Sequence, residues 1–346
     1  MWLIAPENDY RSILDLQAPD PQLRVTVCMP VYNRVDLLAR TVAALAAQSY
    51  PRELMSVSIG DDGSDEDVAA AVAPFSGRLD ITVSRRERDG YGAGQARNLA
   101  ARNSAGDILV FVDSDCLPDP DLVLNHAVWH HLAENLVVIG SRHGVDTSGF
   151  DLDALARGSA PLRELAFGTA EPGPKQLSQT DYRGVLHRRT ADGRHGDEAF
   201  RSLVSSNFSI RRDRFFEIGG FDESFHRWGG EDIELGWRCH VAGLFTVPDD
   251  RAVCYHQLQE DLWDAGGRED SAKLNAGVIQ NKIPHHFYRR YRRGLIRGVP
   301  KVSVVVTPEV PARIEELADH FLSQSYADWE LIAHGTSPET ILFSER

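Results

Sequence analysis

The amino-acid sequence predicts an α/β fold in which a mainly parallel central sheet is flanked by helices. Short apolar runs alternate with helical patterns from residue 23 to about residue 140. Strands separated by helices imply right-handed βαβ crossovers and hence parallel pairing. Polar segments follow the first four apolar runs, and the carboxyl ends of parallel strands are where open sheets of this kind bind ligands.

The alternation can be followed element by element. The expected strands are VTVCM, VSI, ITV, ILVFV and VVIG, at residues 25–29, 57–59, 81–83, 108–112 and 137–140. The expected helices between them cover residues 36–48, 65–73, 94–103 and 119–133. The first helix is the clearest, because Val35, Leu38, Val42, Leu45 and Ala46 are spaced to form one apolar face. Residues 228–243 predict a glycine-rich turn that opens a further helix.

Composition excludes several classes of protein. The 346 residues are 42% hydrophobic, which is typical of a globular chain with a sizeable core. A formal net charge of −14 argues against general nucleic-acid binding, which requires a basic face. No apolar run approaches the ~20 residues of a membrane span. Four scattered cysteines without a CxxC pair argue against a disulfide framework, so we expect a reducing, cytoplasmic environment.

The chain is expected to contain a main domain over residues 23–298, preceded by an N-terminal extension over residues 1–22. Residues 146–200 are weak in periodicity and predict a long irregular insertion. Residues 299–346 partly repeat the start of the main domain, down to a shared QSY. Two interpretations of this repeat stay open: a truncated second domain of the same kind, or a remnant packed on the first.

Two aspartates, Asp113 and Asp115, follow the apolar run ILVFV with one serine between them. Their repulsion at the end of a buried strand requires compensation. A divalent cation such as Mg²⁺ or Mn²⁺, which prefers oxygen ligands, would supply it. For such a pair alone, solvated loop carboxylates are the commoner explanation.

Five motifs give this pair a context. PVYN, DDGSD, ARN, DSD and GGED occur in this order at residues 30–33, 61–65, 96–98, 113–115 and 229–232. In order and spacing they resemble the family-2 glycosyltransferases, and the later motifs look most like bacterial chondroitin polymerases and β-1,4-galactosyltransferases. The resemblance covers about residues 23 to 295. It implies the GT-A fold of nucleotide-diphospho-sugar transferases.

The resemblance implies a donor site for a UDP-sugar. It implies that Asp62 accepts a hydrogen bond from the uracil ring, that Arg97 helps to orient the donor and that Asp113 lies near the ribose. The other donor-binding residues that it implies are Pro30, Tyr32, Asn33 and Ser114.

The resemblance also implies a metal site. Asp115 would ligate the Mn²⁺ or Mg²⁺ ion that bridges the two phosphates, and His256, in the segment CYHQ, would be a further ligand. Imidazole and carboxylate together suit Mn²⁺. A structural histidine with satisfied hydrogen bonds is the alternative for His256.

Glu231 and Asp232 open the helix that follows the turn WGG. One interpretation is a pair of carboxylates that interact favourably with the helix dipole. The resemblance implies instead that Asp232 is the general base that takes the proton of the acceptor hydroxyl and that Glu231 holds acceptor hydroxyls. A carboxylate at Asp232, where related retaining enzymes have Asn, favours an inverting displacement.

These inferences predict a metal-dependent inverting glycosyltransferase that transfers a sugar from a UDP-sugar to a hydroxyl of a glycan, lipid-linked or secondary-metabolite acceptor. Two alternatives are a sugar nucleotidyltransferase and a non-catalytic module that binds nucleotide sugars or a partner. The basic, aromatic run at residues 285–297 is expected to be a solvated helix face. Its alternatives are a diphosphate clamp or peripheral contact with an anionic membrane. The sequence does not predict the oligomeric state.

Overall fold

The computed structural model describes residues 1–5, 7–147, 149–167, 182–194, 196–257, 275–285 and 287–288. It also describes the backbone of the three strands at residues 302–306, 329–333 and 341–344. The chain divides into two compact units, Met1–Ala265 and Gly266–Arg346. The first unit contains every residue of the predicted site.

The first unit is built on an eight-stranded sheet with the order β3-β2-β1-β4-β7-β6-β8-β5. The strands are β1 (Val25–Val31), β2 (Met55–Asp61), β3 (Asp80–Arg85), β4 (Ile108–Val112), β5 (Cys116–Pro118), β6 (Leu136–Val145), β7 (Asn207–Arg211) and β8 (Phe245–Gln257). Five of them occur where the sequence predicts strands.

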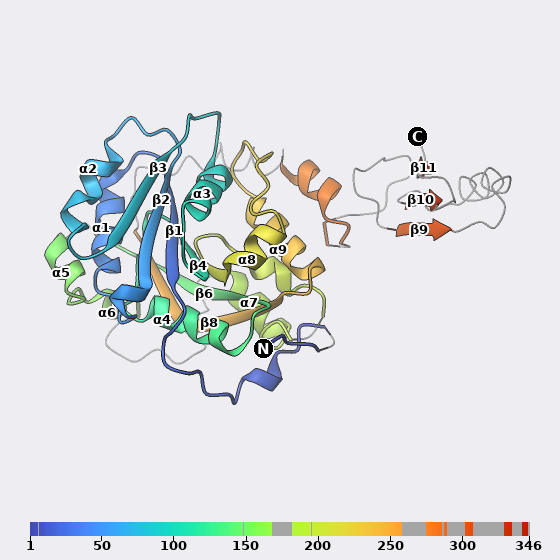
Figure 1. The fold of residues 1–346 in the computed structure, drawn as a ribbon, viewed down its shortest axis with the longest axis horizontal. Helices are drawn as coiled ribbons and strands as arrows, with labels where there is room; N and C mark the ends of the chain where they lie inside the picture. The colour runs from blue at the N-terminus through green and yellow to red at the C-terminus, as the bar shows by residue number, and fades with distance from the viewer. Residues whose placement is uncertain are drawn as a thin grey trace. The chain divides into compact units, whose positions relative to one another are not determined.

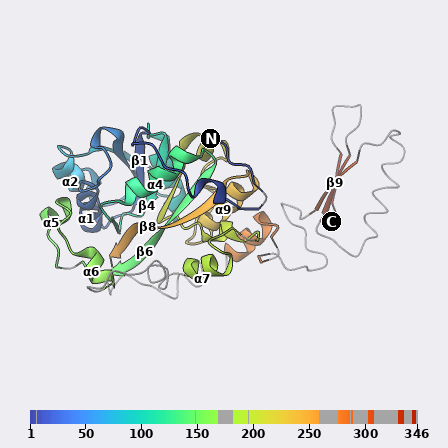
Figure 2. The ribbon, with the colours of Figure 1, turned by 90° about the horizontal axis from the view of Figure 1, so that it is seen from below.

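The sheet is mainly parallel, as predicted. Strands β3, β2, β1 and β4 pair in parallel, and β6 pairs in parallel with β8. Strand β7 is antiparallel to both β4 and β6, and the short β5 is antiparallel to β8. Figure 2 shows β6 and β8 running side by side. The carboxyl ends of β1, β2, β3 and β4 therefore meet at one edge of the sheet.

Helices cover both faces of the sheet (Figure 1). They are α1 (Val35–Leu45), α2 (Val68–Val72), α3 (Ala93–Arg102), α4 (Leu122–Leu132), α5 (Leu152–Ala156), α6 (Leu162–Phe167), α7 (Tyr182–Arg189), α8 (Arg212–Glu217) and α9 (Glu231–Val241). Short 3-10 helices lie at Arg11–Ile13, Arg52–Leu54, Ala73–Phe75 and Ala199–Ser202. The four helices predicted between the first five strands are all present as α1 to α4; α1, α2 and α4 are shorter than expected, and α3 is shifted by one residue.

The two faces of the sheet bury separate apolar clusters because side chains alternate along each strand. In β1, Val27 and Met29 pack in the same cluster as Leu38 of α1, whereas Cys28 packs in the cluster that contains Ala100 of α3. Burying one Val, Leu or Met side chain contributes roughly 1.5–3 kcal/mol. The two clusters thus hold α1 and α3 against opposite faces, with the start of each helix near the carboxyl edge.

The predicted N-terminal extension packs on the first unit. Leu3 and Ile13 are buried in a third apolar cluster, together with Trp129 of α4 and Val138 of β6. In residues 146–200, the described part contains α5, α6, α7 and a 3-10 helix and no strand. The described part of the segment that the sequence predicts to be irregular thus contains three short α-helices, and residues 168–181 lie outside the described residues.

The second unit contains a three-stranded sheet with the order β11-β10-β9. Strands β9 (Val302–Val306) and β10 (Trp329–Ala333) are parallel, and β11 (Ile341–Ser344) is antiparallel to β10. Val302 pairs with Trp329 in this sheet, as Val25 pairs with Met55 in the first unit. The internal repeat in the sequence thus corresponds to the same parallel strand pair.

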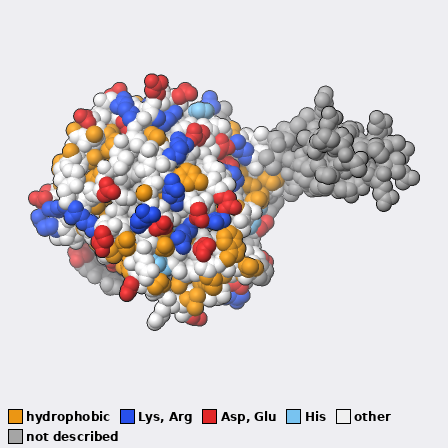
Figure 3. All heavy atoms as spheres, in the orientation of Figure 1, with side chains coloured by type: hydrophobic (Ala, Val, Ile, Leu, Met, Phe, Trp, Pro, Cys, Tyr) orange, Lys and Arg blue, Asp and Glu red, His pale blue; other side chains and the backbone are white. Residues whose placement is uncertain are grey.

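The surface of the described residues is polar and mixed in charge. On the face drawn in Figure 3, Lys and Arg side chains are interspersed with Asp and Glu rather than gathered in a single patch. Among the described helices, none is both long enough and apolar enough to cross a bilayer. The basic run at residues 285–297 lies outside the described residues, apart from His285, Phe287 and Tyr288.

Candidate active site

The ends of β1, β2 and β3 are joined at the carboxyl edge by backbone hydrogen bonds. The amide of Asp62 donates to the carbonyl of Val31, at 2.8 Å, and the amide of Arg86 donates to the carbonyl of Asp61, at 2.9 Å. The polar turns that follow these strands are therefore held next to one another. The polar turns predicted after these strands thus lie together at the carboxyl edge.

Asn33 connects the turn after β1 with the turn after β2. Its amide donates to the hydroxyl of Ser64, at 2.8 Å, and its side-chain oxygen accepts from the amide of Asp65, also at 2.8 Å. Asn33 and Arg34 both have left-handed backbone conformations, with φ of 53° and 56°. Asparagine tolerates this region better than most residues. The Asn33 side chain thus fixes the two turns that flank Tyr32.

Asp62 is buried at the end of β2 and accepts several charged hydrogen bonds. Arg86 bonds to one of its carboxylate oxygens, and the other accepts from Arg88, at 2.7 Å, and from the amide of Gly92, at 3.0 Å. A Cβ atom at Gly92 would collide with this carboxylate, so only glycine fits there. The guanidinium of Arg88 also lies over the ring of Tyr32.

The turn with Asp113, Ser114 and Asp115 connects β4 to β5 and is fixed through its backbone. The carbonyl of Ser114 accepts from the hydroxyl of Thr41, at 2.9 Å, and the carbonyl of Asp115 accepts from the amide of Gln257, at 2.9 Å. Helix α1 and strand β8 thus hold this turn from two directions. The position of the turn therefore does not depend on its two carboxylates.

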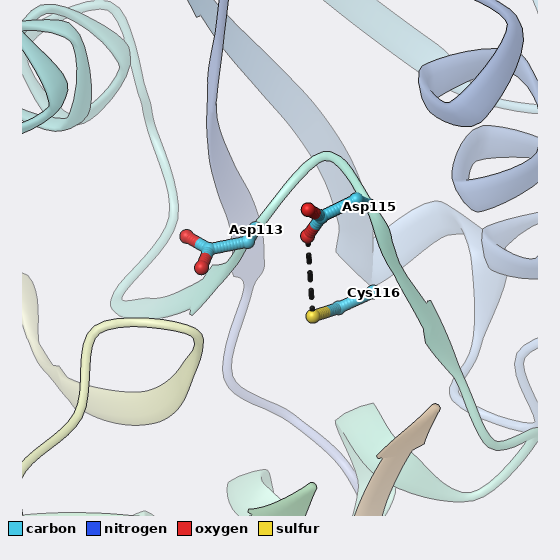
Figure 4. Close-up of side chains that lie close together, drawn as sticks. All are labelled: Asp113, Asp115 and Cys116. Carbon is cyan, nitrogen blue, oxygen red and sulfur yellow. Dashed lines mark hydrogen bonds between the residues drawn. The ribbon is translucent and has the colours of Figure 1, made fainter. Parts of the chain in front are cut away.

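Asp113, Asp115 and Cys116 form a group whose ligand atoms all lie within 4.8 Å of one another. Figure 4 shows the thiol of Cys116 directed at the carboxylate of Asp115, to which it donates over 3.6 Å. On the other side, Nε2 of His256 lies 3.4 Å from Oδ2 of Asp115. Two carboxylates with an adjacent imidazole are donors that suit Mn²⁺ or Mg²⁺, and the thiol adds a softer donor. These residues fit a divalent cation.

The pKa of Asp115 is lowered. Burial by itself would raise this pKa, but the hydrogen bonds from His256 and Cys116 and the charges of His256 and Arg142 together lower it by more. Asp115 is therefore ionised at neutral pH, as a metal ligand has to be.

Arg97 of α3 joins the two sides of the candidate site. It is buried and donates to Oδ1 of Asp113, at 2.7 Å, and to Oε1 of Glu231, at 3.4 Å. Its guanidinium carbon lies 5.4 Å from the centre of the Phe221 ring. A buried cation needs paired carboxylates, so Arg97 fixes the distance between the end of β4 and the start of α9.

Asn98, beside Arg97, holds Phe221 in place. Its side-chain oxygen accepts from the amide of Phe221, at 2.9 Å, and its side-chain nitrogen donates to the carbonyl of the same residue, at 2.8 Å. The same nitrogen donates to Glu223, at 2.8 Å. Helix α3 thereby fixes the segment that leads to Glu231 and Asp232.

Glu231 and Asp232 lie in the first turn of α9, after two glycines with positive φ. Gly229 and Gly230 have φ of 95° and 101°, which residues with a Cβ rarely adopt. Asp232 Oδ1 accepts from the amide of Ile233, at 2.8 Å, so the interpretation as helix-terminal carboxylates has some support. Oε2 of Glu231, in contrast, is buried without a partner among the described residues. Such an oxygen is free to bind a substrate hydroxyl.

Both carboxyl groups hold protons more tightly than usual. Burial, with the charge of Asp232 added to it, raises the pKa of Glu231 to about 7, although Arg97 opposes this increase. Burial also raises the pKa of Asp232. Carboxyls with a raised pKa are suited to exchange protons near neutral pH.

The structure adds residues that the sequence analysis did not single out. Tyr91 lies close enough to interact with Arg97, Asp113, Glu231 and Asp232, and burial raises the pKa of its hydroxyl. Cys116 directly follows the DSD motif, and Asn98 is the last residue of the ARN motif. Their position in or next to a motif could have indicated that both belong to the site. Gln257 follows His256 directly and so had the same signal, whereas Thr41 gave none, because it reaches the site only through the fold.

The chain was compared with known families and proteins. The model of glycosyl transferase family 2 matches residues 26–174, and a model described as the N-terminal domain of galactosyltransferase matches residues 188–249. Validoxylamine A glucosyltransferase from Streptomyces hygroscopicus subsp. jinggangensis is 31% identical over 321 residues, which cover 91% of this chain and 73% of the relative.

Other similarities are more partial. Hyaluronan synthase from Pasteurella multocida is 27% identical over 92% of this chain, which spans only 33% of that relative's length. The structure of GalNAc-T7 with UDP, GalNAc and Mn²⁺ matches with a TM-score of 0.52 at 17% identity, over 76% of this chain and 48% of that one. The likeness to this structure shows the fold. The chain belongs to glycosyltransferase family 2, and its first unit has the GT-A fold.

Proposed function

We propose that this protein is a metal-dependent inverting glycosyltransferase that transfers a sugar from a UDP-sugar to an acceptor hydroxyl. The observation that carries the proposal is the pairing of Arg97 with both Asp113 and Glu231. It connects the acidic turn after β4, the proposed donor side, with the acids at the start of α9, the proposed acceptor side. A transferase needs these two halves next to each other.

The donor half consists of residues from the ends of β1, β2 and β4. Tyr32 offers a half-exposed ring and Asp62 a buried carboxylate for the nucleobase, and Pro30, Asn33 and Ser114 belong to the strand and turns that form the rest of this half. Asp113 remains the proposed contact for the ribose. The presence of UDP in the matched structure of GalNAc-T7 supports this donor class.

Asp115 would hold the divalent cation, and His256 would be a further ligand. When bound, the cation supplies positive charge to the diphosphate that leaves. The lowered pKa of Asp115 keeps this ligand ionised. The Mn²⁺ in the matched GalNAc-T7 structure supports Mn²⁺ or Mg²⁺ for this role.

The acceptor half provides the proton acceptor. The acceptor oxygen attacks the anomeric carbon of the donor sugar, the bond from this carbon to the diphosphate oxygen breaks, and the hydroxyl proton passes to Asp232. A single displacement from the opposite side inverts the anomeric configuration. Glu231, whose Oε2 has no partner among the described residues, positions acceptor hydroxyls. Tyr91 lies near enough to interact electrostatically with both carboxyls.

The acceptor is proposed to be a hydroxyl of a glycan, of a lipid-linked substrate or of a secondary metabolite. The names of the matched hyaluronan synthase and of validoxylamine A glucosyltransferase support the first and the third of these classes. We further propose that residues 299–346 repeat the start of the first unit, because β9 and β10 reproduce the β1 and β2 pair.

The test is a UDP-release assay with a panel of UDP-sugars, acceptors and Mn²⁺. We expect UDP release from one donor, lost in Asp115→Ala and in Asp232→Asn while circular dichroism stays unchanged. Full activity in either variant would refute its assigned role. A nucleotidyltransferase would instead require UTP or pyrophosphate, and a binding module would show neither reaction.

A further inference from the structure

The loop between β3 and α3, residues 86–92, is docked onto the turn after β2. Arg86 and Arg88 both bond to Asp62, and the loop also packs on the backbone of Gly63. Its two ends are fixed, because the amide of Arg86 donates to the carbonyl of Asp61 and the amide of Tyr91 donates to the carbonyl of His226, at 3.3 Å. A change of position within the loop is therefore confined to residues 87–90.

Arg88 makes two different interactions with the proposed nucleobase site. Its guanidinium carbon lies 3.4 Å from the centre of the Tyr32 ring, which is the contact distance of two stacked planar groups. Its Nη1 donates to Oδ2 of Asp62, at 2.7 Å. A nucleobase that stacks on this face of the Tyr32 ring and donates to Oδ2 of Asp62 would need the place that the guanidinium takes. The guanidinium leaves no space for a base on this face.

We propose that Arg88 is a built-in occupant of the nucleobase site and that donor binding exchanges its guanidinium for the base. This inference rests on the proposed function, because it takes Tyr32 and Asp62 as the nucleobase contacts. Asp62 keeps Arg86 on its other oxygen throughout the exchange, so its buried charge is never unpaired. Arg88 moves into solvent, to which its side chain is already 32% exposed.

The exchange lowers the apparent affinity for the donor. A ligand that binds only when the guanidinium has left binds more weakly by the fraction of molecules in which the site is open. Removal of the Arg88 side chain should therefore tighten binding of uridine nucleotides by roughly tenfold. A group that stacked on the bound base or contacted its phosphates would have the opposite effect when removed.

The test is calorimetric titration of the full chain with UDP, UMP and pyrophosphate in the presence of Mn²⁺. We expect Arg88→Ala to tighten UDP and UMP by the same factor and to leave pyrophosphate unchanged, because pyrophosphate has no base. Arg88→Lys, which keeps the charge but loses the planar face, should tighten the two nucleotides by a smaller factor. Arg85→Ala is the matched control, since Arg85 lies at the start of the same segment, is 60% exposed and pairs with Asp61.

Each outcome decides between alternatives. Weaker or unchanged UDP binding in Arg88→Ala overturns the inference, and a change in pyrophosphate binding assigns Arg88 to the phosphates instead. If neither the native protein nor any variant binds a uridine nucleotide, the proposed donor class fails and the inference falls with it. Binding by the native protein without tightening in Arg88→Ala leaves the proposed function intact and removes only the inference. A circular dichroism spectrum that matches the native one confirms that each variant is folded.

Discussion

Arg97 carries a positive charge into the protein interior, with only 4% of its side chain exposed. Removing one member of a buried ion pair typically costs about 3–5 kcal/mol, because the remaining charge is left without a partner. Two carboxylates, Asp113 and Glu231, depend on this one guanidinium. At the scale of single residues, the geometry of the site is thus determined by an electrostatic requirement of the interior.

The variant Glu231→Gln tests whether the carboxyl group of Glu231, which pairs with Arg97, is protonated in the folded protein. Burial raises the pKa of Glu231 from the ordinary 4.5 to about 7. Between these values the folded chain keeps a proton that the unfolded chain releases. This part of the stability is complete below pH 4.5 and is lost as the pH rises to 7. We expect the glutamine variant to lack this decline.

The measurement is the melting temperature of both proteins from about pH 4 to pH 8. A tenfold change in proton affinity corresponds to about 1.4 kcal/mol, so the difference between the unfolding free energies of the two proteins should change by an amount on the order of 1–3 kcal/mol between low and neutral pH, and their melting temperatures should diverge accordingly. Asp250→Asn is the control, because burial raises the pKa of Asp250 to about 6, and we assign this residue no role in transfer. It should change the stability profile and leave transfer unaffected. Parallel curves for Glu231→Gln would contradict the prediction.

Helix α9 begins directly after two residues with positive φ, so its start depends on glycine. Gly230→Ala should cost about 1–3 kcal/mol of stability, since a residue with a Cβ is strained at φ of 101°. It should also displace Glu231 and Asp232 and lower kcat by more than tenfold. Gly243→Ala, with φ of 76° at the other end of α9, should lower the melting temperature without lowering kcat. Equal kcat values in the two variants would show that the turn does not position the acids.

The turn between β4 and β5 depends on a hydroxyl from another element. Thr41→Val removes the donor to the carbonyl of Ser114 without changing the shape of the side chain. A buried acceptor without its partner costs about 1–3 kcal/mol, and we expect the Mn²⁺ concentration for half-maximal activity to rise several-fold. Thr26→Val is the control, because Thr26 is equally buried and hydrogen-bonded to Ser56 but lies at the far end of β1. A rise in both variants would point to general loosening of the fold.

Periodicity was sufficient to predict the elements that pack locally, but not those defined by pairing partners distant in sequence. Alternating apolar runs predicted β1 to β4 and the helices between them, because each has its own apolar face. The sequence did not predict that β7 runs antiparallel to β4. The direction of a strand depends on the path of the connection that precedes it, and the connection before β7 is long and weak in periodicity. The three residues of β5 form a strand only because Cys116 pairs with His256 of β8.

The residues of the candidate site were predictable from the sequence, but most contacts between them were not. Motif order indicated the acids, and the fold brings Asp113, Arg97 and Glu231 into contact. The arginines at positions 86 and 88 were visible as a charged segment, but their bonds to Asp62 depend on how the loop folds back over β2. The sequence therefore indicated the residues of the candidate site. It did not indicate which other residues form hydrogen bonds or ion pairs with them.

The first unit and its site should respond to ligands as one thermodynamic unit, because the site combines residues from β1, β2, β4, β8 and α9. A ligand at 100 times its dissociation constant stabilises the folded state by about 2.7 kcal/mol. UDP with Mn²⁺ should therefore raise the melting temperature by roughly 5–10 °C. Chelation of the metal by EDTA, or Asp115→Asn, should remove most of this increase. A full increase in the presence of EDTA would show that the nucleotide binds without the metal.

Helix α3 holds Asp113 and Glu231 through Arg97 and the backbone of Phe221 through Asn98, so the proposed donor half and the proposed acceptor half share one support. Under the proposed function, the separation between the two reactants would be set when the chain folds, without a closing motion of one half toward the other. Freedom to admit and release substrates is left to the short charged segment at residues 87–90. Turnover in this enzyme should then be limited by how quickly that segment rearranges.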